Sequence, residues 1–255
     1  MNLPGQHSGL VERFTELCRE LVRGANPGVQ LSAELAKLNV AGGGRILLLA
    51  FGDDSSGIPP HWAATEDSAG INMLPRTVEH TVERVRHRTA AIRKPGDILL
   101  ISIHWGDNWG FEIPENQRRL AHALIDAAGA DVIFGHSSHH AKGVEVHNGK
   151  LVLYGCGDLI NDYEGIGGHE QYRGDLAQAY FVDLNPDDGT LAALEIKQYQ
   201  RRKFRLNASD EGALDWLSRA LAHEVLEGAP QFQKSGQHSL RMVQNSDYDF
   251  KDCPP

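Results

Sequence analysis

The sequence contains few cysteines and no long apolar segment. Its three cysteines, Cys18, Cys156 and Cys253, lie far apart and show no Cys-x-x-Cys spacing, so neither a disulfide framework nor a zinc knuckle is predicted. No apolar run approaches the ~20 residues that a membrane span needs, and the N-terminus lacks a basic segment followed by a hydrophobic one. As given, the sequence therefore predicts a cytosolic chain in a reducing compartment.

An excess of positive charge is also missing. The 25 lysines and arginines are outnumbered by 34 acidic residues, which leaves a net charge of −9 and argues against nucleic acid as the main partner. The basic run Arg201-Arg202-Lys203, with Arg205 close by, is interpreted as a solvated strand edge. The chain has no Gly-x-Ser-x-Gly elbow, no P-loop and no Gly-x-Gly-x-x-Gly motif after a strand, so those enzyme classes are discounted.

What the sequence does contain is the pattern of one large α/β domain, which 255 residues can form. Apolar runs of strand length occupy 45–51, 97–103 and 130–135, as in parallel strands covered on both faces. Helical spacing is found at 10–22, 33–38, 78–92, 120–128 and 214–225, the last preceded by Ser209 as a helix cap. Hairpins are predicted at 144–153, with Asn148-Gly149 as the turn, and at 179–199.

Polar clusters follow three of these strands. His104 ends one strand, His136 and His139 follow the next, and Asp158 and Asn161 follow a third strand at 150–154. Ligands of open α/β sheets bind in the crevice outside the carboxyl ends of the strands. We therefore expect the three clusters to share one site.

Several histidines converging from strand ends suit a zinc, manganese or iron ion, because neutral imidazole is a common metal ligand. His104, His136 and His139 are predicted as ligands and catalytic groups, although a histidine after a strand can also have a purely structural role. His140, His147 and His169 are assigned structural roles. The acids on nearby loops are Asp53, Asp54, Asp107, Asp158 and Asp162. Trp105 and Trp109 are predicted either to line a substrate pocket, with Asp158 and Asn161, or to pack in the interior.

Several of these motifs occur together in a known order. His104-Trp105-Gly106, the helix end Ala127-Ala128-Gly129-Ala130-Asp131, Gly135-His136-Ser137-Ser138-His139 and Tyr154-Gly155-Cys156-Gly157-Asp158 resemble the motifs of the CapA family of capsule and poly-γ-glutamate synthesis proteins. In the family pattern, His-Pro stands at Ser137-Ser138 and Asn at Asp158. The family's upstream Gly-Asp, Asn-x-Glu and Asn-His motifs have no counterpart in this sequence.

The resemblance implies a calcineurin-like metallophosphoesterase sandwich, two β-sheets flanked by helices, here lacking its first strands. It spans a domain at 8–205, followed by a helix at 206–227 and a flexible tail at 228–255. It also implies a metal-dependent hydrolase acting on a phosphoester or related bond of a small molecule or polyanionic polymer. The alternative is a non-catalytic, polymer-binding component of a capsule or cell-envelope system, since the missing motifs would weaken binding of manganese, iron or zinc.

Overall fold

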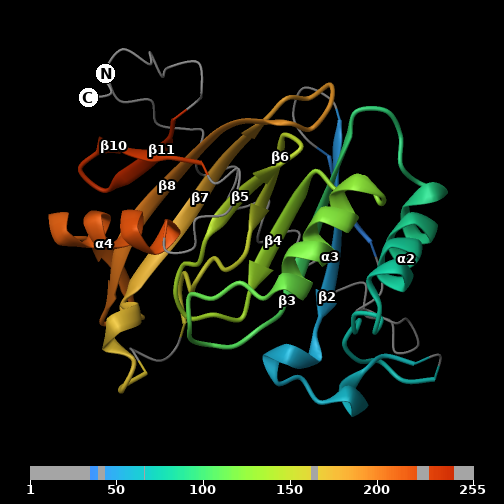
Figure 1. Ribbon diagram of the computed structural model, residues 1–255, viewed down its shortest axis with the longest axis horizontal. Coiled ribbons are helices and arrows are strands. Elements are labelled where there is room, and N and C mark those ends of the chain that lie inside the picture. Colours follow the sequence, from blue (N-terminus) through green and yellow to red (C-terminus); the bar gives the residue numbers. More distant parts are fainter. Residues whose placement is uncertain (1–34, 40–43, 66, 162–165, 223–229, 244–255) are drawn as a thin grey trace.

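The computed structural model describes residues 35–39, 44–65, 67–161, 166–222 and 230–243. Two β-sheets pack against each other, and helices lie on the outside of the molecule (Figure 1). This arrangement confirms the predicted α/β class with two sheets flanked by helices. The helix predicted at 10–22 lies outside the described residues.

The first sheet is largely parallel and carries the strand ends that the sequence singled out. Its six strands stand in the order β1 (Ala36–Asn39), β2 (Arg45–Gly52), β3 (Asp97–His104), β4 (Val132–His136), β6 (Lys150–Leu153) and β5 (Val144–His147). β2, β3, β4 and β6 run parallel, while β1 and β5 pair antiparallel at the two edges. The carboxyl ends of the parallel strands therefore meet at one end of the sheet.

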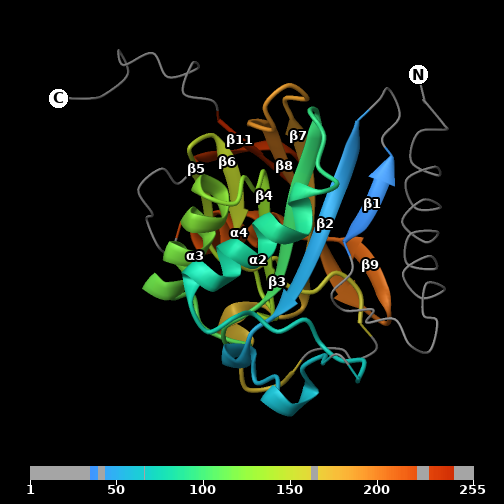
Figure 2. The same ribbon diagram turned by 90° about the vertical axis from the view of Figure 1, so that its right-hand side faces the viewer.

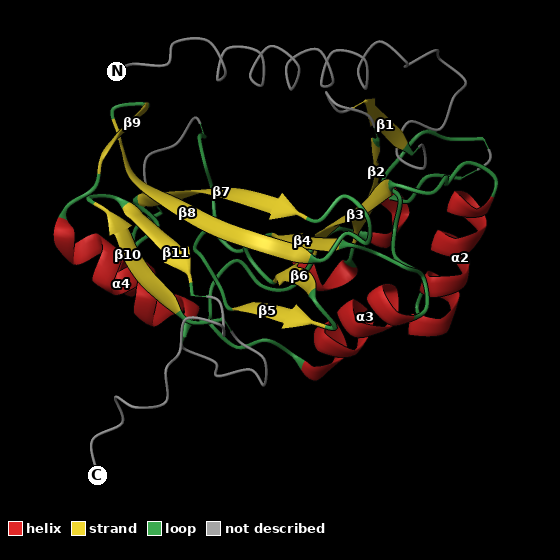
Figure 3. Cartoon of the chain, turned by 90° about the horizontal axis from the view of Figure 1, so that it is seen from above, coloured by secondary structure: helices red, strands yellow, loops and turns green. Residues whose placement is uncertain are grey.

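Two helices, α2 (Val78–Ala90) and α3 (Glu115–Asp126), cover one face of this sheet (Figures 2 and 3). Successive side chains of a strand point to opposite faces, and Leu99, Ile101 and Ile103 of β3 are fully buried in the core beneath the helices. The Thr77 side chain caps α2, and α3 starts after Pro114. The described residues also contain three short 3-10 helices in loops, η2 (Asp54–Ser56), η3 (Pro60–Trp62) and η4 (Glu170–Tyr172).

The second sheet is antiparallel and covers the other face of the first. Its strands are β10 (Phe232–Gly236), β11 (Ser239–Met242), β8 (Leu191–Arg202) and β7 (Leu176–Leu184), in that order, with β9 (Arg205–Ala208) paired to β8. Leu194 and Ile196 pack between the sheets against Val132 and Leu151. The helix α4 (Glu211–Leu221) adds Leu217 and neighbouring leucines to the same cluster.

Three local predictions were wrong. Residues 36–38, expected in a short helix, belong to β1, because pairing with β2 supplies their backbone hydrogen bonds. The cap of α4 is Asp210, whose carboxylate accepts a hydrogen bond from the Ala213 amide at 2.7 Å, and not Ser209. The tail predicted to be flexible contains the β10–β11 hairpin, whose Leu240 is 1% exposed between the sheets. The domain boundaries themselves remain predictions.

The helices that the structure describes are short or amphipathic, and none of them is long and apolar enough to cross a membrane.

Candidate functional site

Neighbouring parallel strands bring two of the predicted histidines together. His104 and His136 are the last residues of β3 and β4, and they face each other in the strand register. Ile103 points to the helices, so alternation places His104 on the opposite face, toward the second sheet. His136 shares that face with Phe134, whose ring centroid lies 5.5 Å from its own. The loop after β2 lies at this same end of the sheet in Figure 1.

The two imidazole rings are in direct contact. Nδ1 of His104 lies 2.9 Å from Nδ1 of His136, and Nε2 of His136 lies 3.0 Å from the Ser102 hydroxyl. A hydrogen bond between two ring nitrogens needs a lone pair on one of them, so the pair does not carry two positive charges. Burial and, to a smaller extent, the charge of His104 together lower the pKa of His136 to about 4. Burial also lowers the pKa of His104, with a smaller contribution from His139.

His139 belongs to a second group of contacts beside this pair. Its Nδ1 lies 2.9 Å from Oδ2 of Asp158, and the same oxygen accepts a hydrogen bond from the Asn161 amide at 3.0 Å. Arg201 completes the group, because its Nη1 lies 3.2 Å from Oδ2 of Asp158. Three residues predicted for the site, His139, Asp158 and Asn161, are thus joined at one carboxylate.

Sequence reasoning missed Arg201. The basic run 201–203 was interpreted as a solvated strand edge, which holds for Arg202 and Lys203. The Arg201 side chain, however, is only 8% exposed, and its guanidinium also donates to the Gly174 carbonyl. No local pattern distinguishes this arginine from its neighbours, because its contacts are with Asp158 and Gly174, which lie far from it in the sequence.

The two tryptophans have different surroundings. Trp105 is 3% exposed, packs in the core beneath the helices, and donates its indole N–H to the Tyr154 carbonyl at 3.0 Å. In this conformation it offers almost no surface to a substrate. It packs in the interior, which is the second of the two roles predicted for it. Trp109 is partly exposed and lies beside the site, with its ring centroid 5.3 Å from that of His139 and 4.3 Å from that of His169.

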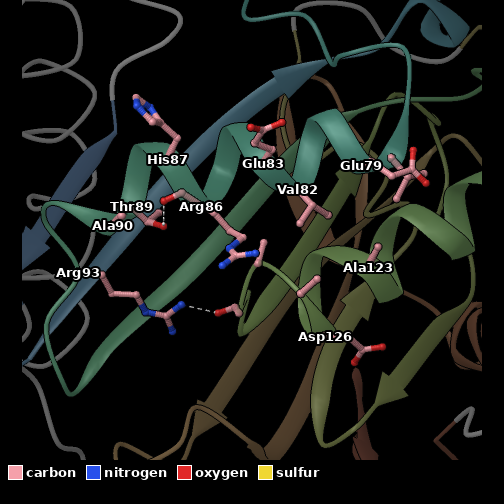
Figure 4. Close-up of a pocket in the computed structure, with 14 residues that line it drawn as sticks. Glu79, Val82, Glu83, Arg86, His87, Thr89, Ala90, Arg93, Ala123 and Asp126 are labelled. Carbon is pink, nitrogen blue, oxygen red and sulfur yellow. Dashed lines mark hydrogen bonds between the residues drawn. The ribbon is translucent and has the colours of Figure 1, made fainter.

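A groove of about 1030 Å³ lies elsewhere, between α2 and α3. Figure 4 shows side chains of both helices around it, including Arg86 and Glu83 from α2 and Asp126 from α3. None of the residues predicted for the site lines this groove. It is therefore separate from the carboxyl ends of the strands.

The comparison with known proteins decides the family. Residues 7–163 match the family described as "Bacterial capsule synthesis protein PGA_cap". The chain belongs to this family. The predicted resemblance to the CapA proteins is thereby confirmed.

Two relatives of the PGA_cap chain show how far the likeness extends. A probable polyglutamine synthesis accessory protein of Mycobacterium tuberculosis is 35% identical over 214 residues, which cover 83% of this chain and 56% of the relative. The PGA biosynthesis protein CapA of Bacillus subtilis is 29% identical over 156 residues, or 60% of this chain and 38% of the relative. The chain thus spans little more than half the length of the first of these relatives.

The backbone of this PGA_cap chain is strained beside the histidine pair. Ser137 has φ 129°, in a region that residues other than glycine rarely adopt. Its hydroxyl donates to the Gly106 carbonyl at 2.9 Å, which ties the loop after His136 to the loop after His104. Strain of this kind persists only where surrounding contacts hold it, and it is frequent at functional sites.

The donors of the site match a metal in kind but do not form a closed ligand set. Neutral imidazoles such as those of His104 and His136 suit divalent transition metals, and a carboxylate on a histidine, as Asp158 is on His139, is a common second contact of metal sites. Within the described residues, however, the one group of three or more such side chains with ligand atoms within 4.8 Å of one another is His122, Glu145 and His147. The ligand atoms of His104, His136 and His139 therefore do not all lie within 4.8 Å of one another, and these three residues do not form a compact ligand set in this structure.

Proposed function

We propose that this PGA_cap chain acts in capsule or poly-glutamate synthesis, and that His104, His136 and His139 form a metal-dependent hydrolase site. The direct contact of His104 with His136 at the ends of adjacent strands carries the proposal. Both rings have pKa values below the ordinary histidine value, so both are neutral at pH 7 and each has one lone pair, which could bind a metal in place of its present contact. The names of the relatives, which refer to capsule, PGA and polyglutamine synthesis, support the proposed process.

In the proposed site, His104, His136 and His139 would hold one divalent ion of manganese, iron or zinc, which would require their ring nitrogens to come closer together than they are in this structure. Such an ion would polarise a phosphoester, or an amide related to poly-γ-glutamate, toward hydrolysis. Asp158 fixes the ring of His139 through Nδ1. Arg201 pairs with the same carboxylate through its buried guanidinium and so helps to hold it beside His139. Trp109 offers an aromatic surface on the same side.

The second candidate is a non-catalytic component that binds an acidic polymer in the same place. It is favoured by one observation: in the part of the chain that the structure describes, the three histidines do not form a compact group of metal ligands, either alone or with a carboxylate. Hydrolysis with two metals needs such a bridging oxygen ligand. Only the hydrolase should turn over a substrate, so a measurement of catalytic activity distinguishes the two candidates.

The test measures hydrolysis of bis(p-nitrophenyl) phosphate, and of poly-γ-glutamate, with and without added Mn²⁺. We expect turnover that depends on Mn²⁺ and is lost in His136→Ala. His80→Ala is the matched control, because His80 is exposed on α2 and belongs to no part of the site. Polymer binding by the wild type without Mn²⁺-dependent turnover of either compound would favour the non-catalytic component instead.

A further inference from the structure

A second histidine-rich cluster joins α3 to the β5–β6 hairpin. His122 comes from α3, and Glu145 and His147 come from β5, two positions apart and therefore on the same face of that strand. β5 lies beside α3 in Figures 2 and 3. Each of the three side chains offers a ligand atom, and these atoms all lie within 4.8 Å of one another. The chemistry of the cluster is thus two imidazoles and one carboxylate.

The internal geometry of the cluster is tight. Nε2 of His122 lies 2.7 Å from Oε1 of Glu145, and the rings of His122 and His147 are stacked with centroids 3.8 Å apart and planes 6° from parallel. Two imidazolium ions at that distance would repel each other. Glu145 is 4% exposed, and within the described residues its ion pair is with His122 and not with lysine or arginine. A buried carboxylate needs a cation, and a bound metal would supply one while both rings stay neutral.

Other side chains hold the three in place. The second oxygen of Glu145 accepts a hydrogen bond from the Tyr154 hydroxyl at 2.6 Å. Both oxygens of Asp126 lie 3.0 Å from Nε2 of His147, and Asn148 donates to Asp126 at 2.8 Å. Carboxylates that orient a histidine, and hydrogen bonds that orient a carboxylate ligand, are recurrent features of protein metal sites.

The cluster is far from the site of the proposed function. His147 pairs with Lys150 at the start of β6. Because the next residue of β6, Leu151, pairs with Val132 of β4, His147 lies level with Asp131. His136 is five positions further along, which corresponds to about 16 Å at ~3.3 Å per residue. The side chains of His122 and His147 are 34% and 20% exposed, so an ion can reach them from solvent.

From these contacts we propose that His122, Glu145 and His147 form a Zn²⁺ site that joins α3 to the β5–β6 hairpin. Two histidines, one glutamate and an open position facing solvent make a four-coordinate set that zinc uses in other proteins. Asp126 is the positioning residue, because it acts through His147. The site goes beyond the proposed function and does not depend on it.

The experiment measures Zn²⁺ bound per chain after equilibrium dialysis at neutral pH, with Zn²⁺ alone as the probe. His122→Ala and His147→Ala should each bind one equivalent less than the wild type, and His80→Ala should match the wild type. Glu145→Gln should also lose the ion while retaining a hydrogen-bonding partner for Tyr154, which guards against misfolding as the cause. Asp126→Asn should weaken Zn²⁺ binding by roughly 10–100-fold. Thermal unfolding should shift upward with Zn²⁺ in the wild type and not in His147→Ala.

The result that overturns the inference is a Zn²⁺ stoichiometry and thermal shift in His122→Ala and His147→Ala equal to those of the wild type. The cluster would then be a hydrogen-bonded network without a metal. The hydrolase site is tested separately by His136→Ala, which removes an equivalent of metal only if that site binds one. Loss in His122→Ala without loss in His136→Ala would support the zinc site and count against metal at the site of the proposed function.

Discussion

We predict that the buried side chain of His140 makes the stability of the fold sensitive to mild acid. The side chain is 1% exposed, its ring is stacked on Tyr172 with centroids 4.7 Å apart, and Phe111 packs edge-on at 4.9 Å. Within the described structure, its Nε2 has no hydrogen-bond partner. Burial is the main reason that the pKa of His140 falls to about 4, and the charge of Lys142 also lowers it. We predict that His140→Phe, which keeps an aromatic ring in the stack, weakens the loss of stability between pH 7 and pH 5.

The sign and size follow from proton linkage. The unfolded chain protonates His140 near the ordinary pKa of ~6.5, whereas the folded chain does so only near a pKa of about 4. Between these values the unfolded state binds more protons, so the free energy of unfolding decreases as the pH falls. For one such group, the decrease from neutral pH to pH 5 is about 2 kcal/mol. His136, with a pKa also lowered to about 4, contributes similarly in both proteins.

The assay is urea unfolding followed by tryptophan fluorescence at several pH values. The phenylalanine ring is larger than imidazole, and any effect of this on packing does not depend on pH. It therefore cancels when the change in unfolding free energy between pH 7 and pH 5 is compared between the variant and the wild type. Between pH 7 and pH 5, the free energy of unfolding should fall by about 2 kcal/mol less in His140→Phe than in the wild type. The control His80→Ala should behave like the wild type. Equal pH dependence in the wild type and His140→Phe would refute the reasoning.

Three further predictions concern the scaffold. Asp97→Asn should lower the free energy of unfolding at neutral pH, because it removes the carboxylate that pairs with Arg45. Arg45 lowers the pKa of Asp97 chiefly by hydrogen bonding, so the difference from the wild type should vanish as the pH falls below ~3.9 and through the lower folded value; urea midpoints across acid pH check this. Leu240→Ala should cost roughly 2–5 kcal/mol in urea unfolding, and a cost near zero would mean that the β10–β11 hairpin is not part of the cooperative fold. Asp158→Asn should destabilise by about 3 kcal/mol because it leaves the Arg201 guanidinium buried and unpaired, and combining it with Arg201→Met should recover most of that loss in thermal unfolding.

Local patterns predicted much of the framework. The apolar run of β3 led to a buried strand that ends at His104, and Asn148-Gly149 gave the hairpin turn, with φ angles of 48° and 77°. The adjacency of His104 and His136 followed from one rule about parallel strand ends. These features depend on neighbours in the sequence or on a general topological principle, and both are available without coordinates.

Long-range contacts account for what the sequence did not reveal. β1 is a strand because β2 pairs with it, and the buried Arg201 contacts Asp158 and Gly174, which lie far from it in the sequence. His147 was assigned a structural role in a turn, yet it meets His122 of α3. The spacing of Glu145 and His147 places both on one face of β5 and is a signal that sequence reasoning did not use. The third member, His122, becomes apparent only when α3 is packed on the sheet.

The measurement that tests the central claim most directly is anomalous X-ray diffraction from crystals grown with Mn²⁺. We predict an anomalous peak within bonding distance of ring nitrogens of His104 and His136, with His139 completing the set, and loss of that peak in His136→Ala. Crystals that show no anomalous density between His104 and His136, even with Mn²⁺ in excess, would contradict the account.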